Sequence, residues 1–133
     1  MDKAILVNEQ IDAGREFAEA FNAYQAVDVI FWLNPADSQD WFLYVASDTI
    51  TDTNLDLAYG EVLRLVGSGR EISLDAFQIK LLNSEEALAM KAKEIRDRHP
   101  ALLATRYNGT NIGGVPVGGA YIYPRLNVTT TVR

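Results

Sequence analysis

The sequence predicts a single α+β domain over residues 1–133, with three helices and a mainly antiparallel sheet of about five strands. Three observations support this fold class. Three segments repeat apolar residues every three or four positions, which is typical of amphipathic helices. Two runs rich in β-branched and aromatic residues flank a turn-forming stretch, which indicates a hairpin. No repeat, low-complexity tract or linker divides the chain, so the elements follow in the order α-β-β-α-β-α-β-β, with the helices expected on one face of the sheet.

The first helix is predicted over residues 8–24. Phe17, Phe21 and Tyr24 recur at spacings of four and three, while acidic and basic residues fill other positions. Gly14 lies inside this segment and weakens the helix slightly, because glycine in a helix interior costs conformational entropy.

A hairpin follows, with strands at residues 27–34 and 41–47. Three apolar residues of the first strand share one face: Val29, Phe31 and Leu33. The second strand is apolar on both faces, so we expect it near the centre of the sheet. Trp32 points to the other, more polar face of the first strand, where it is either an exposed interface residue or is covered by a helix.

The second helix is predicted to follow residues 51–54 and to end at Gly67. Thr53 and Asp56 have the spacing of a capping box, with aspartate in place of the usual glutamate. Five apolar residues form one stripe along the helix: Leu55, Ala58, Val62, Leu65 and Val66.

A further strand is predicted over residues 72–82, either continuous or interrupted near Asp75. A third helix follows, which Ser84 caps and which ends at Arg98. Acidic residues at the start of this helix and basic residues at its end agree with the helix dipole. Its apolar stripe is thin, which indicates a helix on the surface.

The C-terminal part is predicted to form strands at residues 102–107 and 120–123, joined by a glycine-rich segment at 108–119. Two pairs of glycines in this segment indicate two bends: Gly113 with Gly114, and Gly118 with Gly119. Residues 126–133 have the composition of a strand but no obvious partner. They form a candidate extended arm that could add a strand to a neighbouring molecule.

The composition of the chain limits the classes of protein to which it can belong. Apolar residues make up 48% of the chain and charged residues 23%, which is usual for a folded globular domain. The chain has no cysteine, which excludes disulfides and thiolate metal sites. The apolar run near the N-terminus is too short for a signal peptide, and no run reaches the length of a membrane span. We therefore expect a cytoplasmic protein with no membrane association.

Charge is divided unequally along the chain. Residues 1–69 carry three cations and twelve carboxylates, whereas residues 70–133 carry nine cations and six carboxylates. The net charge of −6 thus hides a molecule with an acidic first half and a basic second half. Residues 98–133 contain no aspartate or glutamate. This contrast between the halves favours head-to-tail or two-fold pairing of copies.

No catalytic constellation is recognisable. The glycine-rich segment lacks the Gly-Lys-Ser/Thr ending of a phosphate loop and does not match the dinucleotide fingerprint. His99 is the single histidine and has no nucleophile in a recognisable relation to it. Asp48, Asp52 and Asp56 are spaced by four residues at the entry to a helix, where capping explains them better than a cation does. We therefore expect neither a metal site nor a cofactor.

One site hypothesis remains from the acid-free C-terminal segment. Backbone amides of a glycine-rich loop and nearby guanidinium groups are suited to bind an anion. Two interpretations of this segment stay open. It is either the site of a small enzyme or ligand-binding protein for an anionic substrate, or only the connection between the two strands of a hairpin. The candidate residues are Arg98, Arg106, Tyr107, Gly113, Gly114, Gly118, Gly119, Tyr121, Tyr123 and Arg125. Arginine beside tyrosine is also found in single-strand binders, but the acidic chain lacks a basic cluster, so we expect no nucleic-acid partner.

The sequence favours a small non-catalytic binding or protein-interaction module that self-associates. The divided charge and the candidate arm at residues 126–133 support a homo-oligomer, in the first place a dimer, or a complex with another protein.

Overall fold

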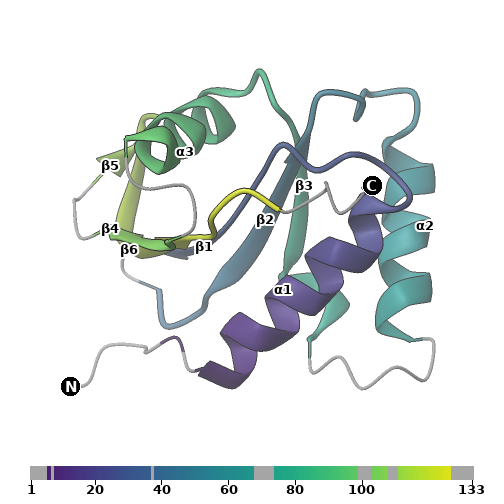
Figure 1. Ribbon diagram of the computed structural model, residues 1–133, viewed down its shortest axis with the longest axis horizontal. Coiled ribbons are helices and arrows are strands. Elements are labelled where there is room, and N and C mark those ends of the chain that lie inside the picture. Colours follow the sequence, from purple (N-terminus) through teal and green to yellow (C-terminus); the bar gives the residue numbers. More distant parts are fainter. Residues whose placement is uncertain are drawn as a thin grey trace.

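The computed structural model describes residues 6, 8–36, 38–67, 74–98, 103–107 and 111–126. These residues form the predicted α+β fold (Figure 1). None of the helices in these ranges is long and apolar enough to cross a membrane. The elements are α1 (Asn8–Asn22), β1 (Val29–Pro35), β2 (Phe42–Ser47), α2 (Leu55–Val66), the short 3₁₀ helix η1 (Ala76–Gln78), β3 (Ile79–Asn83), α3 (Ala87–Asp97), β4 (Thr105–Tyr107), β5 (Asn111–Ile112) and β6 (Val115–Ile122).

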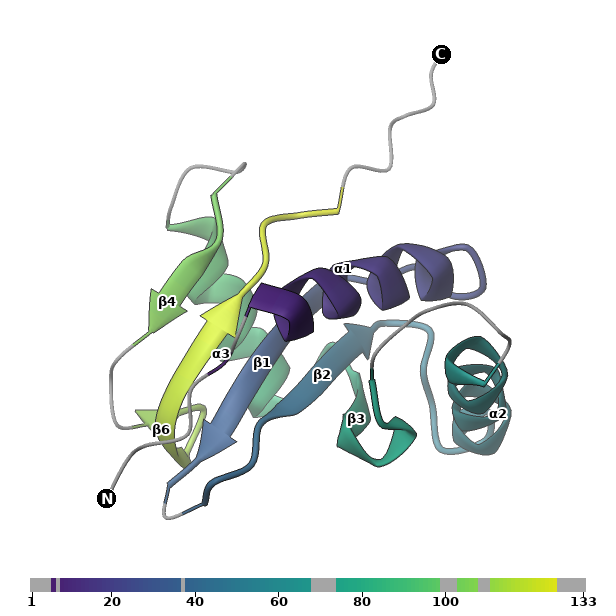
Figure 2. The same cartoon turned by 90° about the horizontal axis from the view of Figure 1, so that it is seen from below.

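The strands lie in the order β3-β2-β1-β6-β4, and β5 pairs with β6 (Figure 2). Four pairings are antiparallel: β1 with β2, β1 with β6, β4 with β6 and β5 with β6. β2 and β3 pair in parallel, so the sheet is mixed rather than purely antiparallel. This parallel pair follows from the connection through α2, because parallel neighbours need a long crossover whereas antiparallel neighbours need only a turn.

Helices cover both faces of the sheet, which corrects the expectation that they share one face (Figure 1). α1 and α2 pack on one face, and α3 packs on the other. β1 is buried throughout because alternate side chains serve the two layers. Ile30 and Trp32 face the α1 layer, while Val29, Phe31 and Leu33 face α3. The near-continuous apolar run of β1 is the sequence signal for a strand covered on both sides.

Trp32 is fully buried beneath α1, so of its two predicted environments the helix-covered one is observed. Its indole Nε1 donates a hydrogen bond of 2.9 Å to the hydroxyl of Tyr123, just beyond β6. That hydroxyl in turn donates a hydrogen bond of 2.6 Å to the carbonyl oxygen of Ile11 in α1. Burial raises the pKa of Tyr123 well above its ordinary value, which keeps the hydroxyl protonated and able to donate. These two hydrogen bonds join α1, the central strand β1 and the residue that follows β6.

Gly14 allows this close approach of α1 to the sheet. A Cβ atom at this position would lie 2.4 Å from the Tyr123 hydroxyl oxygen and 3.0 Å from Trp32 Nε1. Both atoms are fixed by the hydrogen bonds above, so neither can move away freely. Gly14 lowers the intrinsic stability of helix α1, but its lack of a side chain allows α1 to pack closely against the sheet.

The helix starts differ from those predicted. α2 begins at Leu55 after Asn54, and the predicted capping box of Thr53 and Asp56 is wrong. The side chain of Asn54 instead donates to the carbonyl of Thr49 and accepts from the amide of Thr51, forming a turn before the helix. α3 begins at Ala87 and has no side-chain cap, so the predicted cap at Ser84 is also wrong.

The glycine-rich segment is mostly strand. Gly113 and Gly114 form the tight turn between β5 and β6, with φ values of 58° and 89° that favour glycine. Gly118 and Gly119 lie inside β6, so the second predicted bend is wrong. Residues 108–110, residues 127–133 of the candidate arm, and His99 lie outside the described residues.

Gly14→Ala is expected to lower the free energy of unfolding by about 1–3 kcal/mol, because the new methyl group overpacks the Trp32–Tyr123 contact. Urea unfolding in dilute solution measures this. Gly60→Ala in α2 is the matched control, since a Cβ atom there meets nothing within 4 Å. The control should raise stability by about 0.5–1 kcal/mol. Equal effects of the two substitutions would contradict the role of Gly14.

Tyr123→Phe is expected to cost about 1–3 kcal/mol, because it leaves the indole N–H of Trp32 buried without a partner and removes the side-chain hydrogen bond to the carbonyl of Ile11. Tyr121→Phe is the control, since this half-buried tyrosine lies on the same strand face. It should change stability by less than about 0.5 kcal/mol. Chemical denaturation with tryptophan fluorescence follows both, and a neutral Tyr123→Phe would refute the hydrogen-bond chain.

Candidate functional site

Three arginines of the predicted anion site do not converge. Arg98 pairs with Glu94 at 2.5 Å, and Arg125 pairs with Asp97 at 3.0 Å. Both carboxylates belong to α3. Arg106 lies instead on β4, with its guanidinium 5.0 Å from the centre of the Tyr121 ring. Two of the three guanidinium groups are thus already matched with carboxylates.

Arg106, Tyr121 and Tyr123 are brought together on the α1 face of the sheet. Arg106 stands opposite Tyr121 in the β4–β6 register, and Tyr121 stands opposite Trp32 in the β1–β6 register. The rings of Tyr121 and Tyr123 make an edge contact, with centroids 5.2 Å apart. The predicted proximity of a guanidinium group to aromatic rings is therefore present, although Tyr123 is buried and engaged in the core.

The other predicted residues have local roles in the hairpin. The hydroxyl of Tyr107 donates to the carbonyl oxygen of Asn111 at 2.9 Å. The amide of Gly114 donates to the side-chain oxygen of Asn111, also at 2.9 Å. These amide and hydroxyl groups close the turn. None of the ten predicted residues lines any of three prominent cavities in the described part of the chain.

A buried arginine that the sequence analysis missed anchors α3. Arg96 is only 3% exposed. Its Nη1 donates to the backbone oxygen of Asp28 at 2.6 Å, and its Nε donates to Asp97 at 3.0 Å. Lys93 of the same helix pairs with the carboxylate of Asp28 at 3.2 Å. In the sequence, Arg96 is visible only as a basic residue in the last turn of a helix. The helix dipole is enough to explain a cation at that position, so the burial of Arg96 was not predicted.

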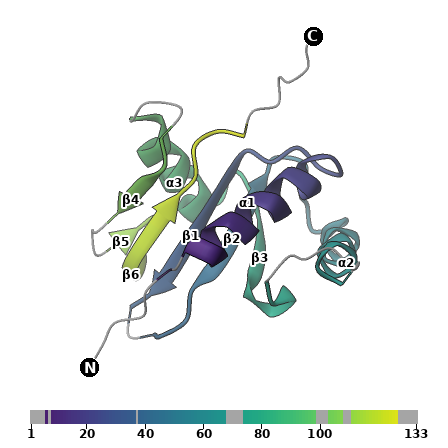
Figure 3. The same cartoon turned by 60° about the horizontal axis from the view of Figure 1, so that its bottom comes forward.

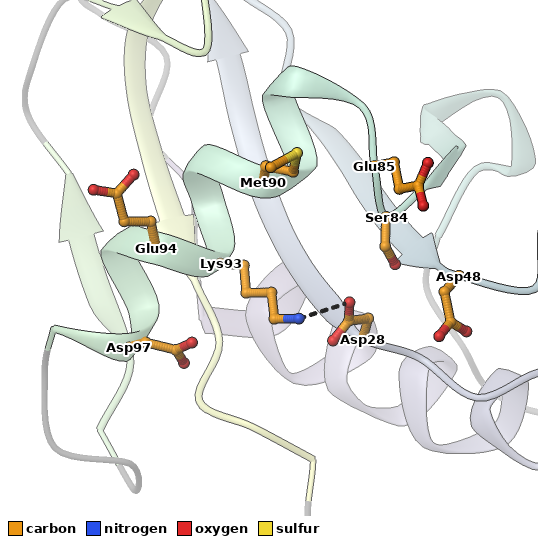
Figure 4. Close-up of a pocket in the computed structure, with 8 residues that line it drawn as sticks. All are labelled: Asp28, Asp48, Ser84, Glu85, Met90, Lys93, Glu94 and Asp97. Atoms are coloured by element: carbon orange, nitrogen blue, oxygen red, sulfur yellow. Dashed lines mark hydrogen bonds and ion pairs between the residues drawn. The ribbon is translucent and has the colours of Figure 1, made fainter.

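An acidic cavity of about 460 Å³ lies beside this anchor, between α3 and the segments next to β1, β2 and β3 (Figure 4). Lys93 reaches across it from α3 toward Asp28 (Figure 4). The lining residues are Asp28, Asp48, Ser84, Glu85, Met90, Lys93, Glu94 and Asp97. Five carboxylates against one ammonium group make the cavity unfavourable for an anion. Within the described ranges no group of three His, Cys, Asp or Glu side chains is placed to hold a metal ion.

An apolar groove of about 260 Å³ lies beside the outer strand β3, between α2 and η1. Phe77 and Leu63 flank it and are 84% and 62% exposed. The hydroxyl of Tyr59 in α2 accepts a hydrogen bond of 3.0 Å from the amide of Leu81 in the outer strand β3. This backbone N–H group therefore has a partner although no strand among the described residues pairs with β3 on that side. The groove is lined by Tyr59, Val62, Leu63, Ala76, Phe77, Ile79 and Lys80. The strand predicted over residues 72–82 allowed for an interruption near Asp75, and η1 follows Asp75 directly, but the groove beside it was not foreseen.

Comparison with protein-family models, with curated proteins and with solved structures finds no match. The inferences below therefore rest on the residues of this chain.

Asp97→Asn tests the ion pairs at the end of α3. Burial raises the pKa of Asp97, but the hydrogen bond and charge of Arg96 lower it, and the charge of Arg125 adds to this. The pKa is therefore held below its ordinary value in the folded state, so the carboxylate stabilises the fold above a pH of about 4. The wild type should be more stable than Asp97→Asn at pH 7, and this advantage should shrink as the pH falls below about 4.

Urea unfolding at pH 7, 5 and 3 measures the difference in the free energy of unfolding. A difference that stays constant down to pH 3 would contradict the assignment, because protonation should make the two side chains nearly equivalent.

Proposed function

We propose that this chain is a non-catalytic protein-interaction module that associates with a second copy of itself. The observation that carries the proposal is a set of exposed apolar side chains on α2 and η1. They lie at the end of the molecule that α2 forms (Figure 3). Leu57, Leu63 and Phe77 are each more than 60% exposed there. Leu63 and Phe77 flank the groove, whereas Leu57 lies on the other flank of α2. Large apolar side chains left exposed in one region of a molecule are a mark of an interaction surface.

The alternative of an enzyme or binder for an anionic substrate has weaker support. Arg98 and Arg125 hold ion pairs with carboxylates of α3, and an anion would have to displace these. The amide of Gly114 is engaged within the hairpin turn. The acidic cavity, with Asp28 and Asp48 in its wall, would repel the same ligand.

Leu63→Ser should weaken self-association at least about tenfold, because it removes a large apolar side chain from the proposed surface. Light scattering across a range of protein concentrations measures the mass, which should rise from the 14.8 kDa of one chain toward twice that value. Leu103→Ser is the matched control, since Leu103 is 60% exposed elsewhere on the molecule. A wild-type chain that stays monomeric at millimolar concentration would refute the proposal.

A further inference from the structure

The outer face of α2 has a symmetric pattern centred on Gly60. With about 100° between successive residues of a helix, Gly60 points opposite the buried stripe of Ala58, Val62 and Leu65. Leu57 and Leu63 lie three residues before and after it, on its two flanks. Asp56 and Arg64 lie four residues before and after it. All five of these outer residues are exposed: Asp56, Leu57, Gly60, Leu63 and Arg64.

Nothing in the described part of the chain explains Gly60. A Cβ atom built on it meets no atom within 4 Å, in contrast to Gly14, whose Cβ would clash with the core. Glycine in a helix interior lowers helix stability relative to alanine, so the residue weakens α2 without any gain in packing inside the chain. Its lack of a side chain does permit another helix to approach closely.

We propose that α2 of one copy packs antiparallel against α2 of a second copy, with the two-fold axis passing at Gly60. This inference rests on the self-association proposed above and specifies its geometry. An antiparallel pair crossing at Gly60 places Leu57 in the same layer as Leu63 of the second copy. It also places Asp56 in the same layer as Arg64 of the second copy. The face is therefore complementary to itself in both shape and charge, as a two-fold interface requires.

The charges select the antiparallel direction. A parallel pair in the same register would place Asp56 beside Asp56 and Arg64 beside Arg64, and like charges at close range repel. Arg64 already pairs with Glu61 of its own helix, through an Nε–Oε1 distance of 2.9 Å. A guanidinium group has five N–H donors in a fork, so it can also reach Asp56 of the second copy.

The position of α2 fits this role. The helix forms one end of the molecule beyond β3 (Figures 2 and 3). Its buried face packs on the α1 layer, which leaves the outer face to solvent in one copy. One helix from each copy is at the low end of the roughly 1,200–2,000 Å² that stable interfaces bury. We therefore expect a dimer that forms at micromolar concentrations and dissociates on dilution.

Disulfide trapping tests the geometry directly, because the chain has no cysteine of its own. In two helices packed 8–10 Å apart, facing Cα atoms come within about 5 Å, which a disulfide can span. Gly60→Cys should therefore cross-link to a dimer at least about tenfold faster under mild oxidation than the control Met90→Cys. Met90 is 57% exposed on α3, away from the proposed interface.

Two further variants are read by light scattering without oxidation. Gly60→Leu should weaken the dimer at least about tenfold while leaving the monomer folded, because there is open space at this site. Asp56→Arg and Arg64→Asp should each weaken it, and the double exchange should restore most of the affinity.

The outcomes separate the two proposals. A dimer that tolerates Gly60→Leu and whose Gly60→Cys variant cross-links no faster than Met90→Cys overturns the α2 arrangement but not self-association. A chain that stays monomeric at all concentrations overturns both. Failure of the double charge exchange to restore affinity overturns the antiparallel direction.

Discussion

The fold depends on the docking of α1 against the centre of the sheet through a chain of two buried hydrogen bonds. Trp32 of β1 donates to Tyr123, and Tyr123 donates to the backbone of Ile11 in α1. Three segments distant in the sequence are thereby fixed relative to one another. The buried indole N–H of Trp32 and the hydroxyl of Tyr123 both have partners, as buried polar groups require. Gly14 permits the approach because any side chain there would displace the Tyr123 hydroxyl. The remaining helices are arranged around this rigid centre.

The two other helices are held by different forces and present different surfaces. α3 is anchored on the opposite face by the buried Arg96. Its guanidinium group donates hydrogen bonds to the backbone oxygen of Asp28 and to the carboxylate of Asp97. This end of the molecule is lined with carboxylates and forms the acidic cavity. α2 is held by apolar packing and by the hydrogen bond between Tyr59 and the amide of Leu81. It leaves apolar side chains in solvent, and burial of such surface is the main driving force for association.

The elements were predictable from the sequence, but their spatial relations were not. Periodicity located the three helices and the hairpin, because apolar spacing is a local property. The side of the sheet that each helix covers depends on long-range packing. The expectation that all helices cover one face was therefore wrong, although the near-continuous apolar run of β1 indicated a strand covered on both sides. The predicted caps at Ser84 and Thr53 were wrong because the neighbouring Asn83 and Asn54 side chains form the turns before α3 and α2. The ten residues of the anion hypothesis do not form one site, because Arg98 and Arg125 lie in ion pairs, Gly113 and Gly114 form a hairpin turn, and Tyr123 lies in the core. Arg96 and the surface around Gly60 were missed. The apolar stripe of α2 already places Gly60 on the outer face, but only the structure shows that a Cβ atom there would meet nothing within 4 Å.

The central claim is that the outer face of α2 is the surface through which two copies meet. Amide chemical shifts measured by NMR over a dilution series test it most directly, because they report on each residue of the unmodified chain. The account predicts concentration-dependent shifts concentrated at Asp56, Leu57, Gly60, Leu63 and Arg64, with the amides of α3 and the indole of Trp32 unchanged. Shifts that are absent at every concentration, or that gather on α3 or the β5–β6 hairpin instead, would contradict it.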